Sequence, residues 1–264
     1  MDDVEGARTF GVSGATYDSF MGRYSRVLGA QFADAAGVRR GHTAVDVGCG
    51  PGALTAVLVE RLGIGSVAAC DPSPQFVTEC AVRHPGVRVE LGRAESIPFE
   101  TGGYDHAMAQ LVLHFVSDPD SAASEMMRVV RPGGWVSACV WDFDGGMEML
   151  RYFWDAAIEF DPAAPDQAET MRFGRPGEIS QLLESAGLTD VVESTLRVSS
   201  RYASFEELWN GFLAGVGPAG AYCLSLSDDD RQRLRTALFR RLGEPTGSFA
   251  LSAVARSAVA RTPA

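Results

Sequence analysis

Apolar and polar residues along this chain alternate between short runs rich in β-branched side chains and longer amphipathic stretches. The spacing predicts strands at residues 43–47, 66–70, 87–91, 104–111 and 135–141, and helices at residues 53–62, 74–83 and 122–130. Strands that are separated by helices pair in parallel through right-handed crossovers. We therefore predict an α/β fold built on a doubly wound, mostly parallel sheet.

The pattern changes after residue 141. Residues 142–175 hold an aromatic helix between a pair of glycines and a stretch rich in proline and aspartate, which is typical of an insertion over the active face. Residues 176–264 are expected to complete the sheet, with helices at 176–186, 205–213 and 229–242 and strands at 191–198 and 249–261. The last strands would form a hairpin-like edge beside a core of residues 41–141.

Composition narrows the class of protein. With 264 residues, 46% of them hydrophobic, the chain can bury the core of one α/β domain that carries insertions. The net charge of -11 repels polyphosphate, so nucleic-acid substrates are disfavoured. No apolar run approaches the roughly 18 residues of a membrane span, and the acidic N-terminus is unlike a secretory signal. We expect a soluble, cytoplasmic protein, and a homodimer is an assembly that the sequence leaves open.

The spacing of cysteine and histidine disfavours metal and disulfide chemistry. The five cysteines form no CxxC pair and leave an odd one over, and the four histidines lack a metal-ligand spacing. We therefore expect reduced, mostly buried thiols and no bound metal.

A glycine-rich turn follows the first predicted strand, at the edge where open parallel sheets bind ligands. Gly48 and Gly50 let the backbone approach a ligand closely, and the following helix begins with N–H groups suited to a carboxylate or phosphate. The turn also fits the dinucleotide pattern G-x-G-x-x-G/A, so an NAD-dependent oxidoreductase has to be weighed. Asp46 argues against a dinucleotide, because a carboxylate just before the turn suits a cationic ligand and opposes a pyrophosphate.

Two further acidic residues are typical of a nucleoside site. Asp71, at the end of the second predicted strand, can accept two hydrogen bonds from a ribose diol. This role indicates a nucleoside but does not distinguish one nucleoside cofactor from another. Glu95 follows the third strand and can accept a hydrogen bond from the exocyclic amine of adenine. A solvated loop carboxylate is the alternative interpretation of Glu95.

Four motifs together resemble the class I S-adenosylmethionine (SAM)-dependent methyltransferases. They are Val45-Asp46-Val47-Gly48-Cys49-Gly50-Pro51-Gly52, Asp71-Pro72-Ser73-Pro74, Ala94-Glu95-Ser96-Ile97-Pro98-Phe99 and Arg128-Val129-Val130-Arg131-Pro132-Gly133-Gly134. Within that family the chain is similar to the small-molecule branch of the methyltransferase domain 11 type, which includes the ubiquinone and menaquinone biosynthesis methylases. The resemblance runs from residue 17 to residue 141 and is weak beyond it.

The resemblance implies a Rossmann-like sheet of seven strands, the last of them antiparallel, that binds SAM and releases S-adenosylhomocysteine. The residues implied to bind the cofactor are Asp46, Gly48 and Gly50 at the methionine end, Asp71 at the ribose, Pro72 and Ser73 beside the adenine, Ala94 and Glu95 at the adenine edge, and Gln110, whose backbone carbonyl would accept the methionine ammonium.

The N-terminal segment resembles the family's helical lid, which would occupy residues 1–40. Aromatic faces attract a sulfonium, so Tyr17 or Tyr24 closing over SAM is a physically sensible interpretation that also excludes water. In the alternative, Tyr17, Phe20 and Tyr24 form one apolar helix face packed on the sheet.

Methyl transfer from a sulfonium needs alignment of the reacting atoms and exclusion of water more than a side-chain nucleophile. His114, just past the fourth predicted strand, is the candidate general base, and the alternative is a histidine that packs beneath the loop. Trp141, Tyr152 and Trp154 are candidates to line the acceptor pocket, and the alternative is that they form the core of the insertion.

The absence of two sequence motifs narrows the chemical class of the methyl acceptor. The chain reads Ala109-Gln110-Leu111-Val112 where enzymes that methylate amide or adenine nitrogens carry an (Asn/Asp)-Pro-Pro-(Tyr/Phe) motif, and no Pro-Cys nucleophile is recognisable. With the acidic charge, these absences favour a small metabolite. The leading hypothesis is a SAM-dependent methyltransferase, and the rivals are an NAD-dependent oxidoreductase and a non-catalytic SAM-binding protein.

Overall fold

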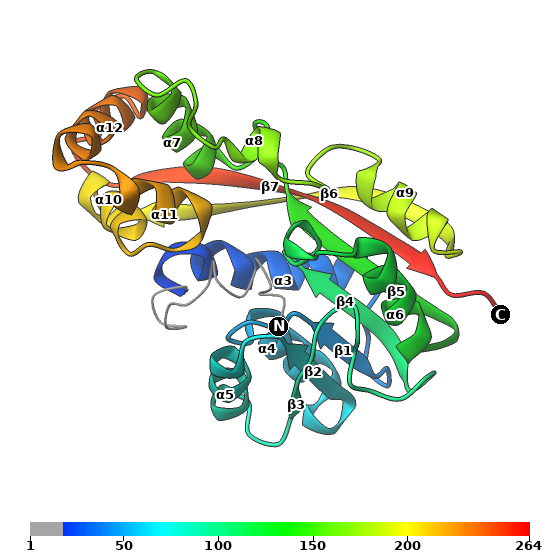
Figure 1. The fold of residues 1–264 in the computed structure, drawn as a ribbon. Coiled ribbons are helices and arrows are strands. Elements are labelled where there is room, and N and C mark those ends of the chain that lie inside the picture. Colours follow the sequence, from blue (N-terminus) through cyan, green and yellow to red (C-terminus); the bar gives the residue numbers. More distant parts are fainter. Residues whose placement is uncertain (1–17) are drawn as a thin grey trace.

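The computed structural model describes residues 18–264, whose strands form one seven-stranded sheet (Figure 1). The strands are β1 (Ala44–Val47), β2 (Val67–Asp71), β3 (Arg88–Leu91), β4 (Tyr104–Gln110), β5 (Val130–Trp141), β6 (Thr189–Tyr202) and β7 (Phe249–Arg261). They lie in the order β3-β2-β1-β4-β5-β7-β6. β7 runs antiparallel to both of its neighbours, and the first five strands pair in parallel. The predicted seven-stranded, mostly parallel fold is confirmed.

Helices pack on the sheet along its whole width. They are α3 (Arg23–Ala35), α4 (Ala53–Leu62), α5 (Pro74–Arg83), α6 (Pro119–Val129), α7 (Glu148–Ile158), α8 (Gln167–Thr170), α9 (Glu178–Ser185), α10 (Phe205–Leu213), α11 (Gly217–Ser225) and α12 (Asp228–Arg241), with short turns η1 (Asp18–Gly22), η2 (Ile64–Ser66) and η3 (Leu113–Phe115). α3 packs against α4, and α6 packs against α9. Figure 1 shows α7, α10, α11 and α12 gathered at one end of the long β6–β7 pair. The helical insertion after β5 is therefore present.

Burial explains why the strands take these places in the sheet. Every residue of β1 and β2 is buried, as expected of central parallel strands that are covered on both faces. The C-terminal half of β6 instead alternates buried and exposed side chains, which suits a strand with one solvated face. The hydrophobic core of small alanine side chains in the middle of the sheet allows helices to approach closely on both sides.

Several elements differ from the predictions. β6 extends over residues 189–202, beyond the expected 191–198, because it pairs with β7 along almost its full length. β5 begins at Val130, before the expected 135–141. α11 was not predicted, since its glycines and small side chains give it little amphipathic pattern. The N-terminal helix α3 lies within the expected helical segment of residues 1–40 and packs against α4 and β6. Within residues 18–264, no helix combines the length and the apolar character needed to cross a bilayer.

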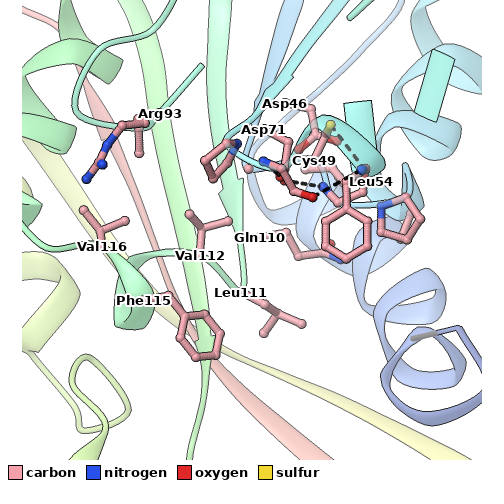
Figure 2. Close-up of a pocket in the computed structure, with 18 of the residues that line it drawn as sticks. Asp46, Cys49, Leu54, Asp71, Arg93, Gln110, Leu111, Val112, Phe115 and Val116 are labelled. Carbon is pink, nitrogen blue, oxygen red and sulfur yellow. Dashed lines mark hydrogen bonds between the residues drawn. The ribbon is translucent and has the colours of Figure 1, made fainter. Parts of the chain in front are cut away.

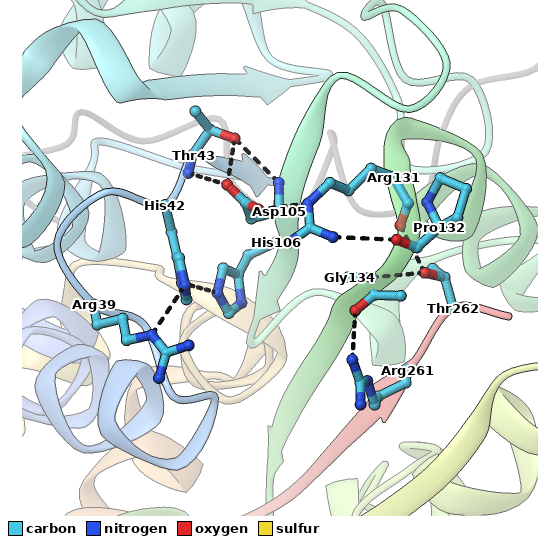
Figure 3. Close-up of polar contacts among 11 residues, drawn as sticks. Arg39, His42, Thr43, Asp105, His106, Arg131, Pro132, Gly134, Arg261 and Thr262 are labelled. Atoms are coloured by element: carbon cyan, nitrogen blue, oxygen red, sulfur yellow. Dashed lines mark hydrogen bonds and ion pairs between the residues drawn. The ribbon is translucent and has the colours of Figure 1, made fainter. Parts of the chain in front are cut away.

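The rings of His42, His106 and Trp135 stack near the amino ends of β1 and β4, and Figure 3 shows the two histidines with the polar contacts around them. His42 Nδ1 and His106 Nε2 lie 2.8 Å apart, and the His106 ring stacks on Trp135 with a centroid distance of 4.9 Å. Next to them, Asp105 accepts hydrogen bonds from the backbone N–H of Thr43 and from Arg131. Burial, with a smaller contribution from His42, lowers the pKa of His106 to about 4. The folded protein therefore favours the neutral form of His106.

We expect this stack to make stability depend on pH. The pKa of His106 lies below the unfolded value of about 6.5, so its stabilising contribution is complete above pH 6.5 and is lost as the pH falls towards 4. Between pH 7.5 and pH 5 the wild-type protein should lose about 2 kcal/mol more unfolding free energy than His106→Phe, which keeps a ring but cannot titrate. Urea unfolding at both pH values measures this difference. Equal losses in the two proteins would contradict it.

Candidate functional site

A pocket opens at the carboxyl ends of β1, β2 and β4 (Figure 2). It holds about 990 Å³ of space not occupied by atoms. Nine of the residues predicted to bind a cofactor line it together: Asp46, Gly48, Gly50, Asp71, Pro72, Ser73, Ala94, Glu95 and Gln110. Segments that are far apart in the sequence therefore meet at the edge of the sheet where the glycine turn was expected to bind a ligand. The contact that each residue makes with a cofactor stays a prediction.

The glycine turn is fixed by its own backbone hydrogen bonds. Gly48 and Cys49 both donate to the carbonyl of Cys70, at 2.8 and 3.0 Å, and Gly50 donates to Asp71 Oδ2 at 2.8 Å. Gly48 has a φ of 72°, and a Cβ there would lie 2.5 Å from a methyl group of Val112. Glycine is thus required at position 48 by both conformation and space. The N–H groups of residues 48–50 are already occupied by the protein itself.

Asp46 is a buried carboxylate in the floor of the pocket. Asp46 is only 1% exposed, and Thr55 Oγ1 donates a hydrogen bond to its Oδ2 at 2.6 Å. Burial raises the pKa of Asp46 to about 7; the hydrogen bond from Thr55 opposes this shift and the nearby charge of Asp71 adds to it. Thr55 was not identified from the sequence, because nothing in its spacing distinguishes it from other polar residues at the beginning of a helix.

Asp71 lies beside Asp46 and holds two loops in place (Figure 2). Its two oxygens accept hydrogen bonds from the N–H groups of Gly50, at 2.8 Å, and Ser73, at 2.9 Å. Burial raises the pKa of Asp71 to about 6, although these backbone hydrogen bonds lower it. Ser73 in turn caps α5 through its hydroxyl. Each Asp71 oxygen has a further lone pair with which to accept a hydroxyl from a ligand.

Glu95 is tied to its surroundings at the far wall of the pocket. It forms an ion pair with Arg93 at 3.2 Å and accepts a hydrogen bond from the N–H of Ser117 at 3.2 Å. Burial alone would raise the pKa of Glu95, but the hydrogen bonds from Arg93 and from backbone groups outweigh it and the pKa is lowered. Arg93 also lines the pocket and was missed from the sequence, where it reads as an ordinary loop cation.

Gln110 connects the pocket to the N-terminal helix. Its Nε2 donates to the backbone carbonyl of Ser25 on α3 at 3.0 Å, while its Oε1 is buried without a hydrogen-bond partner among residues 18–264. Ser25 itself lines the pocket. α3 thus forms part of the wall through Ser25, although its Tyr24 does not line the pocket.

Of the two tyrosines predicted to close over a cofactor, Tyr24 does not line this pocket, and Tyr17 lies outside the described residues. Tyr24 is fully buried, its hydroxyl lies 3.1 Å from that of Tyr202, and its ring meets Trp141 edge-on at 6.1 Å between centroids. This placement favours the alternative that Tyr24 belongs to an apolar helix face. Its contact with a cofactor stays a prediction.

A second pocket adjoins the first and shares Leu111 and Phe115 with it. It holds about 440 Å³ of space not occupied by atoms. Trp141, predicted to line the acceptor pocket, and His114, the predicted general base, line it, whereas the other two predicted acceptor residues, Tyr152 and Trp154, line neither pocket. Trp154 instead donates to Gln167 Oε1 at 3.0 Å, and Gln167 does line the second pocket. Gln167 comes from the insertion and was not identified from the sequence.

His114 is buried in an aromatic environment. Its ring centroid lies 4.0 Å from that of Phe115 and 5.3 Å from that of Phe143. Burial, together with the charge of Arg172, lowers the pKa of His114 to about 3, so the imidazole is neutral at pH 7. A group with so low a pKa takes up a proton weakly, so this pKa disfavours the predicted role of His114 as a general base.

Several residues that line the first pocket were not predicted from the sequence. Leu111, Val112, Phe115 and Val116 follow β4 directly and form the wall opposite Asp46 and Asp71 in Figure 2. Their position just beyond the carboxyl end of a central strand is a signal that sequence reasoning could have used. Leu111 has a φ of 62°, an uncommon backbone conformation for a side chain of its size.

Part of the chain, mostly in its N-terminal half, is similar to known proteins. Residues 45–138 match the family described as a methyltransferase domain. The chain is 30% identical over 130 residues to a malonyl-[acyl-carrier protein] O-methyltransferase of Erwinia billingiae, covering 49% of this chain and 51% of that protein. It is 37% identical over 101 residues to a demethylmenaquinone methyltransferase of Beutenbergia cavernae, covering 38% of this chain and 41% of that protein. The aligned part thus spans about half the length of these relatives or less.

A solved structure shares the fold over most of the chain. The phosphoethanolamine N-methyltransferase 2 of Haemonchus contortus, in complex with S-adenosyl-L-methionine, superposes with a TM-score of 0.54 at 15% sequence identity. The superposition covers 89% of this chain and 52% of that protein. This superposition shows that the two proteins share a fold.

Proposed function

We propose that this chain, whose residues 45–138 form a class I SAM-dependent methyltransferase domain, transfers a methyl group from SAM to a small molecule. The observation that carries the proposal is the pair of buried carboxylates, Asp46 and Asp71, beside a glycine turn whose own N–H groups are already occupied. The pocket therefore presents negative charge to a ligand where a dinucleotide site would present free donors.

Electrostatics separates the two cofactors. A pyrophosphate placed near Asp46 would meet a second negative charge and would find the N–H groups of residues 48–50 bonded to Cys70 and Asp71. A sulfonium or ammonium in the same place would relieve the cost of burying two carboxylates, a cost visible in the raised pKa of each. The site thus supports a cationic methionine tail over a diphosphate bridge.

The chain's own residues would bind and orient the reactants. SAM supplies an electrophilic methyl group on its sulfonium. Thr55 holds the carboxylate of Asp46 in place, and Asp71 is positioned by two N–H groups to accept ribose hydroxyls. The apolar wall of Leu111, Val112 and Phe115 excludes water beside the reacting atoms. Alignment in a dry site is the main requirement of an in-line displacement, so no side-chain nucleophile is needed.

Calorimetric titration of the full chain tests the cofactor. We expect saturable binding of SAM and of S-adenosylhomocysteine and no heat from NAD under the same conditions. The reverse pattern would remove the proposal and favour an oxidoreductase. Release of S-adenosylhomocysteine in the presence of a panel of small metabolites then separates a methyltransferase from a protein that binds SAM without turnover.

We also expect SAM affinity to weaken at acidic pH. With a pKa of about 7, Asp46 is largely protonated at pH 5.5 and must release its proton to pair with a cation, so affinity should fall about 10-fold or more between pH 7.5 and pH 5.5. The range stays below the pKa of an α-amino group, about 8, so the ligand keeps its charge. Titrations in two buffers of different ionisation enthalpy detect the released proton.

Asp46→Asn provides the control for this pH dependence. The amide keeps the size of the side chain and can still accept from Thr55, but it has no proton to release. Its SAM affinity should be lower at pH 7.5 and should fall less steeply than that of the wild type down to pH 5.5, because of the two carboxylates only Asp71, with a pKa of about 6, still titrates in this range. A variant that retained the wild-type pH dependence would assign the titration to another group.

A further inference from the structure

The second pocket lies where a methyl acceptor would have to be. It shares Leu111 and Phe115 with the cofactor pocket, so a molecule bound there would lie against side chains that also line the cofactor pocket. Its remaining walls come from η1, the end of β5, α7, α8 and the beginning of α11. The pocket is therefore assembled from both ends of the chain around the family domain.

Among residues 18–264, the lining of this pocket carries no charged side chain. It consists of aromatic and aliphatic groups, with His114, Trp141 and Gln167 as the polar exceptions. Because an ionised ligand would have to leave water without a partner of opposite charge, such a lining selects against charged molecules. It favours a flat or compact apolar ligand.

Two of the polar exceptions have an unsatisfied nitrogen. Trp141 Nε1 and His114 Nδ1 are both buried without a hydrogen-bond partner among residues 18–264, and their residues are 1% and 8% exposed. Gln167, in contrast, is held through its Oε1 by Trp154. An indole N–H can only donate, so the acceptor atom for Trp141 has to come from outside residues 18–264. A buried polar group without a partner is a common sign of a site that a ligand completes.

We propose that the second pocket binds the methyl acceptor and that this acceptor is an uncharged, mainly apolar molecule with an oxygen that pairs with Trp141 Nε1 and His114. The neutral imidazole contributes as a hydrogen-bonding partner of the same polar group. This inference rests on the proposed function, because it takes the neighbouring pocket as the cofactor site.

Three naphthalene probes test the chemistry of the pocket. 2-Naphthol is uncharged and has one oxygen, naphthalene has none, and 2-naphthoate carries a charge on the same ring system. Equilibrium dialysis against the full chain saturated with S-adenosylhomocysteine measures each affinity. We expect 2-naphthol to bind at least 10-fold more tightly than the other two. Equal or tighter binding of 2-naphthoate would overturn the uncharged class.

Substitutions test the two nitrogens. Trp141→Phe keeps an aromatic ring and removes the N–H, so it should weaken 2-naphthol about 10-fold and leave naphthalene within about 2-fold. His114→Phe, which also keeps a ring, should weaken 2-naphthol in the same direction and provides a second test if the tryptophan variant does not fold. Trp135→Phe is the matched control, because Trp135 belongs to the same strand, β5, but lines neither pocket. It should change neither affinity.

The outcomes distinguish this inference from the proposed function. If S-adenosylhomocysteine binds but no naphthalene probe does, or if Trp141→Phe and His114→Phe bind 2-naphthol like the wild type, the acceptor class is wrong and the cofactor assignment stands. If S-adenosylhomocysteine itself does not bind, both proposals fall. Selective loss of 2-naphthol binding in both variants, with cofactor affinity kept within about 2-fold, supports the inference.

Discussion

Replacing Asp71 by alanine is expected to weaken SAM binding about 100-fold or more. The carboxylate would accept two ribose hydroxyls, and hydrogen bonds to a charged group contribute about 1.5–3 kcal/mol each. The same side chain also accepts from the N–H groups of Gly50 and Ser73, so its loss would loosen the glycine turn and the start of α5. Calorimetric titration of the folded variant with SAM measures the effect.

Asp105→Ala is the control for this experiment. Asp105 also accepts a backbone N–H, from Thr43 at 2.7 Å, but it lies at the amino end of β4, away from the pocket. Its loss should cost stability without changing SAM affinity. Should Asp71→Ala fold and bind SAM like the wild type, Asp71 would have no part in the cofactor site.

Replacing Gly48 by alanine is expected to disrupt both the fold of the turn and cofactor binding. The new Cβ would lie 2.5 Å from a methyl group of Val112, in a backbone conformation with a φ of 72°. Left-handed backbone and overpacking each cost about 1–3 kcal/mol, so we expect a loss of about 3 kcal/mol in unfolding free energy. Chemical unfolding measures the stability, and titration with SAM shows whether the displaced turn still binds.

Two variants separate the causes of that loss. Gly37→Ala is the matched control for conformation, because Gly37 has a φ of 68° and nothing within 4 Å of the added Cβ. It should lose about 1 kcal/mol and keep full SAM affinity. Adding Val112→Ala to Gly48→Ala removes the colliding methyl groups and should restore part of the stability. No recovery in the double variant would show that the contact with Val112 is not the cause.

Much of the fold was predictable because its central strands are short, buried and separated by amphipathic helices. The final strand was predicted at residues 249–261, and β7 has these bounds, since an apolar run of small residues ends at both sides in turn-forming sequence. The pocket was predictable for a related reason: Asp46, Gly48 and Asp71 lie at or just after the carboxyl ends of two adjacent parallel strands, and these ends meet at one edge of the sheet.

What sequence reasoning missed depends on contacts between distant segments. Thr55 orients Asp46 across a turn, Gln167 joins the second pocket from an insertion, and α11 supplies a wall although it has little amphipathic pattern. Tyr24 illustrates the opposite case, because its aromatic ring suggested a role at the cofactor but its partner Tyr202 lies 178 residues away in β6. Local spacing carries no information on such partners.

The β6–β7 ladder has a consequence for how this protein can change. Tyr202 pairs with Phe249, so the 203–248 segment leaves the sheet and returns to it at the same point. Substitutions or insertions at exposed positions of that excursion would leave the ladder intact, as is usual where the two ends of an inserted segment are held together, whereas its buried side chains, such as Phe212, belong to the core. Because residues 216–219 of the excursion form one side of the second pocket, preference for a new acceptor can evolve, or be grafted, while the family domain at residues 45–138 stays constant.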